Sequence, residues 1–209
     1  MKKSHLIFFT IVIGCGGSPK VGDPDAGHPP DGGVPDGGMP CENTVVAVAL
    51  ESTRAGLPWS HIPETEDPVY TNNPPVNGEH YELRWGQWAP SSTEVPRAYW
   101  VHNLEHGGVV FLYRPDAPQS IIDALLSAYN NATNDSVCVS AGFPHKRIVV
   151  TPDHLLPPDL PWAAVVADVQ IDANNGHKVT GACVNVDILR AFAESRRGKS
   201  VEENCSPPP

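Results

Sequence analysis

The stretch GGVVFLY, residues 107–113, predicts the central strand of a sheet. Its unbroken apolar run suits a strand buried on both faces, and the two glycines at its start let other backbone come close. Further β-prone runs occur at 147–151 and 162–171, and the run at 45–50 suits another buried strand. Together these runs predict a small mixed or antiparallel sheet.

Two helices are predicted to pack on this sheet. The first begins after Asp116 and Pro118 and ends at Asn130-Asn131. The second covers residues 186–196. Each carries an apolar stripe at helical spacing, formed by Ile121, Ile122, Leu125, Leu126 and Tyr129 in the first and by Ile188, Leu189 and Phe192 in the second.

Residues 56–96 are rich in Pro, Asn, Gly and Trp. This composition predicts a long ordered loop region with one or two short strands, held in place by Trp59, Trp85 and Trp88. Because strands and helices do not alternate as regular βαβ units, the predicted fold class is α+β.

The N-terminus predicts a secreted lipoprotein. Lys2-Lys3 and the apolar run from Leu6 to Ile13 are typical of a signal peptide over residues 1–14. The segment Val12-Ile13-Gly14-Cys15 is similar to a lipobox, which predicts that Cys15 carries acyl chains such as palmitate. Gly16 in place of Asp favours the outer membrane of the cell envelope. Residues 19–40 are nearly all Pro, Gly and Asp, so we expect residues 15–40 to form a disordered tether.

Charge and hydropathy limit the partners. The formal charge is −10 and falls by two more when Lys2 and Lys3 leave with the leader, so a nucleic-acid partner is excluded. No apolar run beyond the leader is long enough to span a bilayer, and we expect membrane attachment through the lipid anchor alone.

Four cysteines remain for disulfides after Cys15 is set aside: Cys41, Cys138, Cys183 and Cys205. An even number in an oxidising compartment predicts two bridges within one folded domain, residues 41–209. Three connectivities are open. Cys41 with Cys205 would join the ends of the domain, and would leave Cys138 to pair with Cys183.

The densest polar cluster is YWVHNLEHGG, residues 99–108. A spacing of four places His102 and His106 on one side of either a helix or a strand, so both can reach one ion. His102, Glu105 and His106 also spell H-x-x-E-H, the order of inverzincin proteases, but Gly107-Gly108 and the strand that follows break the helix that such a site needs. Two interpretations stay open: a hydrogen-bonded network that includes Asn103, or a metal site without protease geometry.

A set of motifs resembles the bacterial domain of unknown function 3105 family. The motifs are HIP at 61–63, NPPVNGEHY at 73–81, WGQW at 85–88 and HNLEHGGVV at 102–110, followed by the strand that ends in Tyr113. Weaker similarity continues to about Asp168. The chain has Val76-Asn77 where Thr-Ser is usual, and Glu79 where Pro is usual. The resemblance assigns no function, but implies that His61, His80, His102 and His106 belong to one recurrent set.

Four histidines and one carboxylate are the ligands that zinc or copper requires. We expect His102 and His106 to be the best ligands and His80 the third, with His61 or Glu105 as the fourth ligand or a supporting partner. Four ligands would make a structural site, whereas three with an open position could activate water. His145, His154 and His177 have the pattern of solvated surface residues, and His28 lies in the tether.

The leading hypothesis is an envelope lipoprotein that binds a transition metal for structure, sensing or transfer. The alternative is a non-catalytic module with a structural histidine network, in which exposed Trp59, Trp85 and Trp88 recognise a protein or glycan. A zinc-dependent hydrolase comes third. Because the chain lacks the G-x-S-x-G, P-loop and dinucleotide motifs, an enzyme is not favoured.

Overall fold

The computed structural model describes residues 41–202 and Cys205. The predictions for the signal peptide, Cys15, the tether and His28 lie outside these residues. Within the described part of the chain, no helix has both the length and the apolar character needed to cross a membrane.

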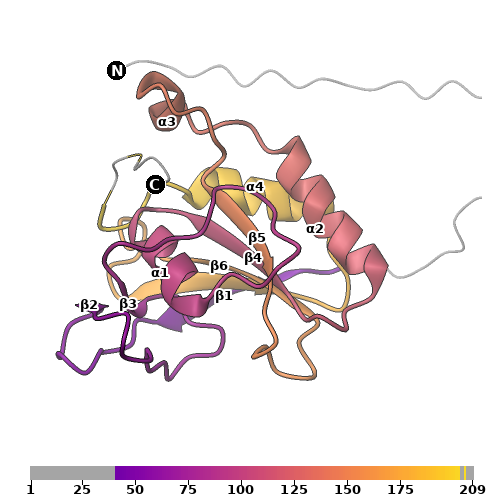
Figure 1. Cartoon of the computed structure of the whole chain (residues 1–209). Coiled ribbons are helices and arrows are strands. Elements are labelled where there is room, and N and C mark those ends of the chain that lie inside the picture. Colours follow the sequence, from indigo (N-terminus) through magenta and orange to yellow (C-terminus); the bar gives the residue numbers. More distant parts are fainter. Residues whose placement is uncertain (1–40, 203–204, 206–209) are drawn as a thin grey trace, which may run out of the picture. The chain divides into compact units, whose positions relative to one another are not determined.

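A mixed five-stranded sheet forms the centre of the described residues (Figure 1). Its strand order is β1-β7-β6-β4-β5. β4 pairs in parallel with β5, and the other neighbours pair antiparallel. The strands are β1 (Thr44–Ala49), β4 (Val109–Tyr113), β5 (Ile148–Pro152), β6 (Trp162–Val166) and β7 (Asn175–Thr180).

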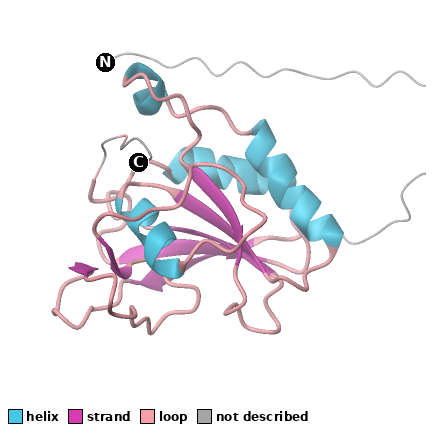
Figure 2. Ribbon diagram, viewed as in Figure 1, coloured by secondary structure: helices cyan, strands magenta, loops and turns pink. Residues whose placement is uncertain are grey.

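Both faces of this sheet are covered (Figure 2). Val109, Phe111 and Tyr113 of β4 point into a core shared with α2 (Gln119–Asn131) and α4 (Val186–Arg196). Val110 and Leu112 point into the opposite core, which includes residues of α1 (Arg97–Glu105) and of the loop region. The alternation of side chains along β4 therefore places α1 on the face of the sheet opposite to α2 and α4.

The loop region contains a small parallel sheet of β2 (Trp59–Ile62) and β3 (Gly78–Tyr81). A fourth helix, α3 (Ser136–Ser140), is a single short turn. These elements confirm the α+β class, the two short strands among residues 56–96 and both packed helices, whose predicted starts after Pro118 and at Val186 are correct.

Three details of the predicted elements are wrong. β1 is an edge strand rather than a buried one, because it pairs only with β7 in the sheet, and Val45 is 44% exposed. β6 ends at Val166 rather than reaching Ile171, since Asp168 to Asp172 form a turn. α1 is not among the predicted helices, because it is buried around most of its circumference and so has no apolar stripe in its sequence.

The disulfides join Cys41 to Cys183 and Cys138 to Cys205, which corrects the suggested pairing of Cys41 with Cys205. The reason is the register of the edge strand. Thr44 of β1 lies opposite Thr180 of β7 in an antiparallel pair, so Cys41 and Cys183, each three residues further out, also meet. β7 is not among the predicted strands, so this register could not be predicted from the sequence.

Candidate metal centre

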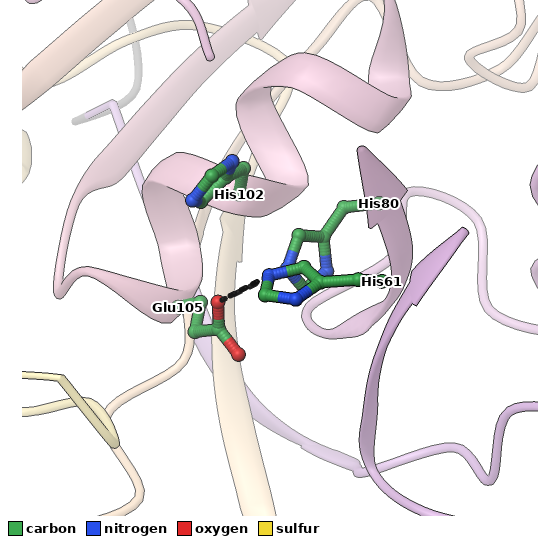
Figure 3. Close-up of side chains that lie close together, drawn as sticks. All are labelled: His61, His80, His102 and Glu105. Atoms are coloured by element: carbon green, nitrogen blue, oxygen red, sulfur yellow. Dashed lines mark hydrogen bonds and ion pairs between the residues drawn. The ribbon is translucent and has the colours of Figure 1, made fainter. Parts of the chain in front are cut away.

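Two histidines of the centre come from the small sheet. β2 and β3 are parallel, and His61 lies directly opposite His80 in their register. Neighbouring residues in register project to the same face, so the two imidazoles lie together, with ring centroids 4.7 Å apart. Figure 3 shows both side chains directed toward the helix that carries His102 and Glu105.

Helix α1 supplies the other two groups. His102 and Glu105 are three residues apart, so both face the same side of the helix. Oε2 of Glu105 lies 3.0 Å from Nε2 of His80 and 3.7 Å from Nε2 of His61. One ligand atom from each of His61, His80, His102 and Glu105 lies within 4.8 Å of all the others. Three separate segments, β2, β3 and α1, thus bring three imidazoles and a carboxylate to one point.

Backbone carbonyls orient two of the imidazole rings. Nδ1 of His80 lies 3.0 Å from the carbonyl oxygen of Gly78, and Nδ1 of His102 lies 2.8 Å from that of Tyr81. A carbonyl oxygen only accepts hydrogen bonds, so each Nδ1 carries a proton and donates it. In a neutral ring this leaves the Nε2 lone pair available, which is the tautomer and support found in metal-binding histidines.

His80 has acceptors at both ring nitrogens. Nδ1 donates to Gly78, while Nε2 faces the carboxylate of Glu105 at 3.0 Å. A neutral ring has only one N–H, so one of these contacts would set a lone pair against an acceptor. The arrangement is satisfied by a second proton on the ring or by a cation that His80 and Glu105 share. Because the His80 side chain is fully buried, the cost of leaving this contact unsatisfied is high.

Electrostatics keeps His102 in the form that a metal needs. Burial, together with the neighbouring His80 and His106, lowers the pKa of His102 from 6.5 to about 4. For Glu105, burial acts to raise the pKa, but the hydrogen bond and charge of His80 outweigh it and the net pKa is lowered. The centre therefore presents a neutral imidazole and an ionised carboxylate at neutral pH.

The low pKa of His102 predicts how stability depends on pH in metal-free protein. Unfolding returns His102 to a pKa near 6.5, so below that pH the unfolded chain binds a proton that the folded chain refuses until about pH 4. We expect the free energy of unfolding to fall by up to about 3 kcal/mol between pH 6.5 and 4 and to level off below it. Urea unfolding in the presence of a chelator measures it, with His102→Gln as the reference. If the free energy of unfolding of His102→Gln fell equally steeply between pH 6.5 and 4, the low pKa would not belong to His102.

His106 stands behind His102. It directly follows the last residue of α1, and its Nε2 lies 2.9 Å from Nε2 of His102. Its Nδ1 lies 3.2 Å from a carboxylate oxygen of Glu202. The structure therefore groups His61, His80, His102 and Glu105, and connects His106 to them through His102. The role of His106 as a direct ligand stays a prediction.

The chain does not continue as a helix after the H-x-x-E-H motif, as an inverzincin protease site would require. α1 ends at Glu105, Gly107 has a positive φ of 73°, and β4 begins at Val109. The amide of Gly108 donates to the carbonyl of Asn103 over 2.7 Å, which closes the turn between helix and strand. The two glycines thus end the helix, as the sequence indicated.

Polar residues missed in the sequence analysis hold β3 in place. The carboxylate of Glu79 is 1% exposed and accepts from Nε of Arg54 at 2.8 Å and from the amide of Val69 at 3.0 Å. The hydrogen bond from Arg54 lowers the pKa of Glu79 despite its burial. Asn77 bonds both the amide and the carbonyl of Glu51. Two of the positions that depart from the family pattern, Asn77 and Glu79, therefore hold the segment that leads into His80 through buried hydrogen bonds.

The tryptophans do not form an exposed recognition face. Trp88 is buried and Trp59 and Trp85 are half-buried. Trp59 packs edge-on against His80 and Trp85 against His102, with ring centroids 6.1 and 5.4 Å apart. Their indoles shield the histidines from water, which removes the feature that favoured a protein- or glycan-binding module.

The other histidines in the described residues differ in exposure. His154 is exposed and pairs with Glu94, as expected of a surface residue. His177 lies on β7, not in a loop, with Nδ1 2.7 Å from the fully buried carboxylate of Asp168. His145 is half-buried and stacks on Trp88, with ring centroids 5.1 Å apart. The solvated interpretation is therefore wrong for His145 and His177.

A second cluster of ligand atoms contains Cys138, His145 and Cys205. Its sulfurs are bonded to each other as a disulfide, with the two Cα atoms 5.1 Å apart. Disulfide sulfurs are not the thiolates that metals prefer, so this cluster is not a metal centre in the oxidised protein.

Comparison with known proteins gives one match. The model of a family described as a protein of unknown function (DUF3105) matches residues 61–204, which include every member of the candidate centre. No curated protein and no solved structure gives a significant match.

Proposed function

The chain belongs to the DUF3105 family of proteins of unknown function, and we propose that it binds a divalent transition-metal ion through His61, His80, His102 and Glu105. The observation that carries the proposal is the orientation of His80. Its Nδ1 is used by a backbone carbonyl while its Nε2 faces a buried carboxylate, and a shared cation satisfies both. Most of this His/Glu cluster is buried, and an unbalanced charge in a buried site is costly in free energy.

The donor set favours zinc or cupric copper. Zinc and cupric copper both bind well to imidazole nitrogens and carboxylate oxygens, and the cluster offers three imidazoles and one carboxylate. Thioether sulfur, which selects cuprous copper, is absent from the cluster. In a tetrahedral zinc site, ligand atoms about 2.1 Å from the ion lie about 3.4 Å from one another. The present spacing of up to 4.8 Å therefore requires the most distant pair of ligand atoms to approach by about 1.4 Å on binding.

The exposure of His61 favours an exchangeable ion over a sealed structural one. Its side chain is 46% exposed, whereas those of His80 and Glu105 are 0% and 10% exposed. An ion can thus enter on the His61 side and leave when that ligand swings out. We propose sensing or transfer of the metal at the cell envelope, with the protein anchored through Cys15 in the outer membrane.

A zinc-dependent hydrolase is the second candidate. If His61, His80 and His102 alone held the ion, Glu105 would be free to accept a proton from a bound water. Its closeness to two imidazole nitrogens is the observation that favours this arrangement. Hydrolysis of an activated ester by zinc-loaded protein, lost in Glu105→Gln while zinc is retained, would select it over sensing or transfer.

Metal content tests the proposal. The protein is purified without a His-tag, stripped with a chelator, incubated with zinc or copper, desalted and measured by mass spectrometry. We expect about one ion per chain. No retained metal would leave the histidines as a hydrogen-bonded network and overturn the proposal.

His106 and His61 should respond differently to substitution. Nε2 of His106 contacts Nε2 of His102, whose lone pair the ion would use, so His106→Ala removes a competing hydrogen bond and should not weaken metal affinity. His61→Ala removes a ligand and should weaken metal affinity by about 100-fold or more. Competition titration against a chromophoric chelator measures both. A loss of affinity in His106→Ala as large as that in His61→Ala would show that His106 is itself a ligand.

A further inference from the structure

The two disulfides differ in the groups that contact their sulfurs. Nε of Arg147 lies 3.1 Å from Sγ of Cys138, and Nε2 of His145 lies 3.1 Å from Sγ of Cys205. Both sulfurs of this bridge thus face nitrogen donors. For Cys41–Cys183, the polar contact among the described residues is a neutral amide, Nδ2 of Asn43 at 3.9 Å from Sγ of Cys41.

The imidazole of His145 is set to donate. Its Nδ1 accepts a hydrogen bond from the backbone amide of Arg147 at 3.2 Å, so in the neutral ring the proton is on Nε2. That proton points at Cys205. Stacking on Trp88 fixes the plane of the ring, with an angle of 7° between the two rings.

The guanidinium of Arg147 is a buried positive charge. The residue is 1% exposed, and Nε lies 3.8 Å from Oδ2 of Asp135. Arg197 approaches the same carboxylate oxygen, with Nε at 3.6 Å. Oδ2 of Asp135 thus lies near two guanidinium groups. The guanidinium that contacts Sγ of Cys138 favours a thiolate over a thiol at that sulfur.

We propose that Cys138–Cys205 is a redox-active disulfide, opened by a dithiol partner that attacks Cys205. Cys138 is fully buried and Cys205 is half-buried, so the accessible sulfur is that of Cys205. A hollow of about 330 Å³ lies beside His145, and Trp88, Phe143 and Pro144 also line it.

The exchange balances in two steps. A thiolate of the partner attacks Sγ of Cys205, the bond between the two cysteines breaks, and its electron pair leaves with Cys138 as a thiolate beside Arg147. The partner's second thiol loses its proton to solvent and attacks the partner sulfur of the mixed disulfide. Cys205 then leaves as a thiolate that Nε2–H of His145 stabilises. The partner is oxidised to a disulfide, and Cys138 and Cys205 are reduced.

Solvent exposure alone predicts that Cys41–Cys183 is reduced before Cys138–Cys205. Cys41 and Cys183 are both half-buried, so neither sulfur of that bridge is as protected as Cys138. If access governed the reaction, Cys41–Cys183 would open first. If stabilisation of the leaving thiolate governs it, Cys138–Cys205 opens first, since a leaving thiol of lower pKa departs faster.

The test titrates the full-length protein with dithiothreitol, traps free thiols by alkylation and identifies them by peptide mass mapping. We expect Cys138 and Cys205 to be labelled at a dithiol concentration about tenfold lower than Cys41 and Cys183. His145→Phe keeps a ring against Trp88 but lacks the N–H. It should narrow the difference in dithiothreitol concentration between the two bridges severalfold, while Cys41–Cys183 still opens at the same concentration. Circular dichroism confirms that each sample stays folded.

Arg147→Met is a second variant, which removes the guanidinium that stabilises the Cys138 thiolate. The folded variant should also require more dithiothreitol than the wild-type protein to open Cys138–Cys205. The proposal is overturned if Cys41–Cys183 opens first or together with Cys138–Cys205, or if His145→Phe leaves the difference unchanged. These outcomes do not depend on whether the histidine centre binds metal.

Discussion

Loss of metal binding is the expected result of replacing His80 and His102 together by alanine. The two side chains are buried, their Nδ1 atoms are oriented by backbone carbonyls, and they come from separate elements, so the double variant removes ligands from both sides of the centre. We expect the affinity for zinc to fall by a factor of about 1,000 or more, beyond the 10- to 100-fold loss typical of a supporting residue. Isothermal titration calorimetry measures the change.

The control for this variant is His154→Ala, which removes an exposed histidine that pairs with Glu94 outside the cluster. It should bind zinc as the wild-type protein does. Buried substitutions can also disturb folding, so the thermal unfolding of the metal-free double variant is measured in parallel. A folded double variant that still binds zinc tightly would refute the ligand assignment.

The second large effect is expected at Gly107, which joins His106 to the turn before β4. Its φ is +73°, and a Cβ built there would lie 2.7 Å from Cα of Gly198. Gly107→Ala therefore adds both an unfavourable backbone conformation, about 1–2 kcal/mol, and a clash with backbone, about 1–3 kcal/mol. We expect a loss of about 2–5 kcal/mol in the free energy of unfolding, measured by urea denaturation.

Gly56 offers a matched control because its φ is +74° and a Cβ there would meet nothing within 4 Å. Gly56→Ala should cost only the conformational part, about 1–2 kcal/mol. The difference between the variants isolates the packing of the turn against Gly198. Equal losses would mean that the close approach of Gly107 and Gly198 adds no constraint.

Much of the fold could be predicted because its signals are local. β4, α2 and α4 have continuous or periodic apolar patterns, and all three form where the sequence indicates. β7 could not be recognised because its sequence, NGHKVT, alternates weakly and is only partly buried. The disulfide pairing depends on β7, so it could not follow from the cysteine spacing.

The members of the candidate centre could be predicted, but their arrangement could not. His61, His80, His102 and Glu105 lie in motifs that the sequence displays. Which of these side chains meet in space depends on the register of β2 with β3 and on the direction of α1, and both are tertiary features. The spacing of His102 and His106 predicted their contact, which the structure has at 2.9 Å, but it could not predict that His61 and His80 also lie beside His102.

X-ray absorption spectroscopy of the wild-type protein loaded with one equivalent of zinc tests the metal centre most directly. We predict a coordination shell of three imidazoles and one carboxylate oxygen at about 2.0–2.2 Å, with the multiple-scattering signature of histidine. A shell of water and carboxylate oxygens without imidazole, or zinc that is lost on desalting, would contradict the account.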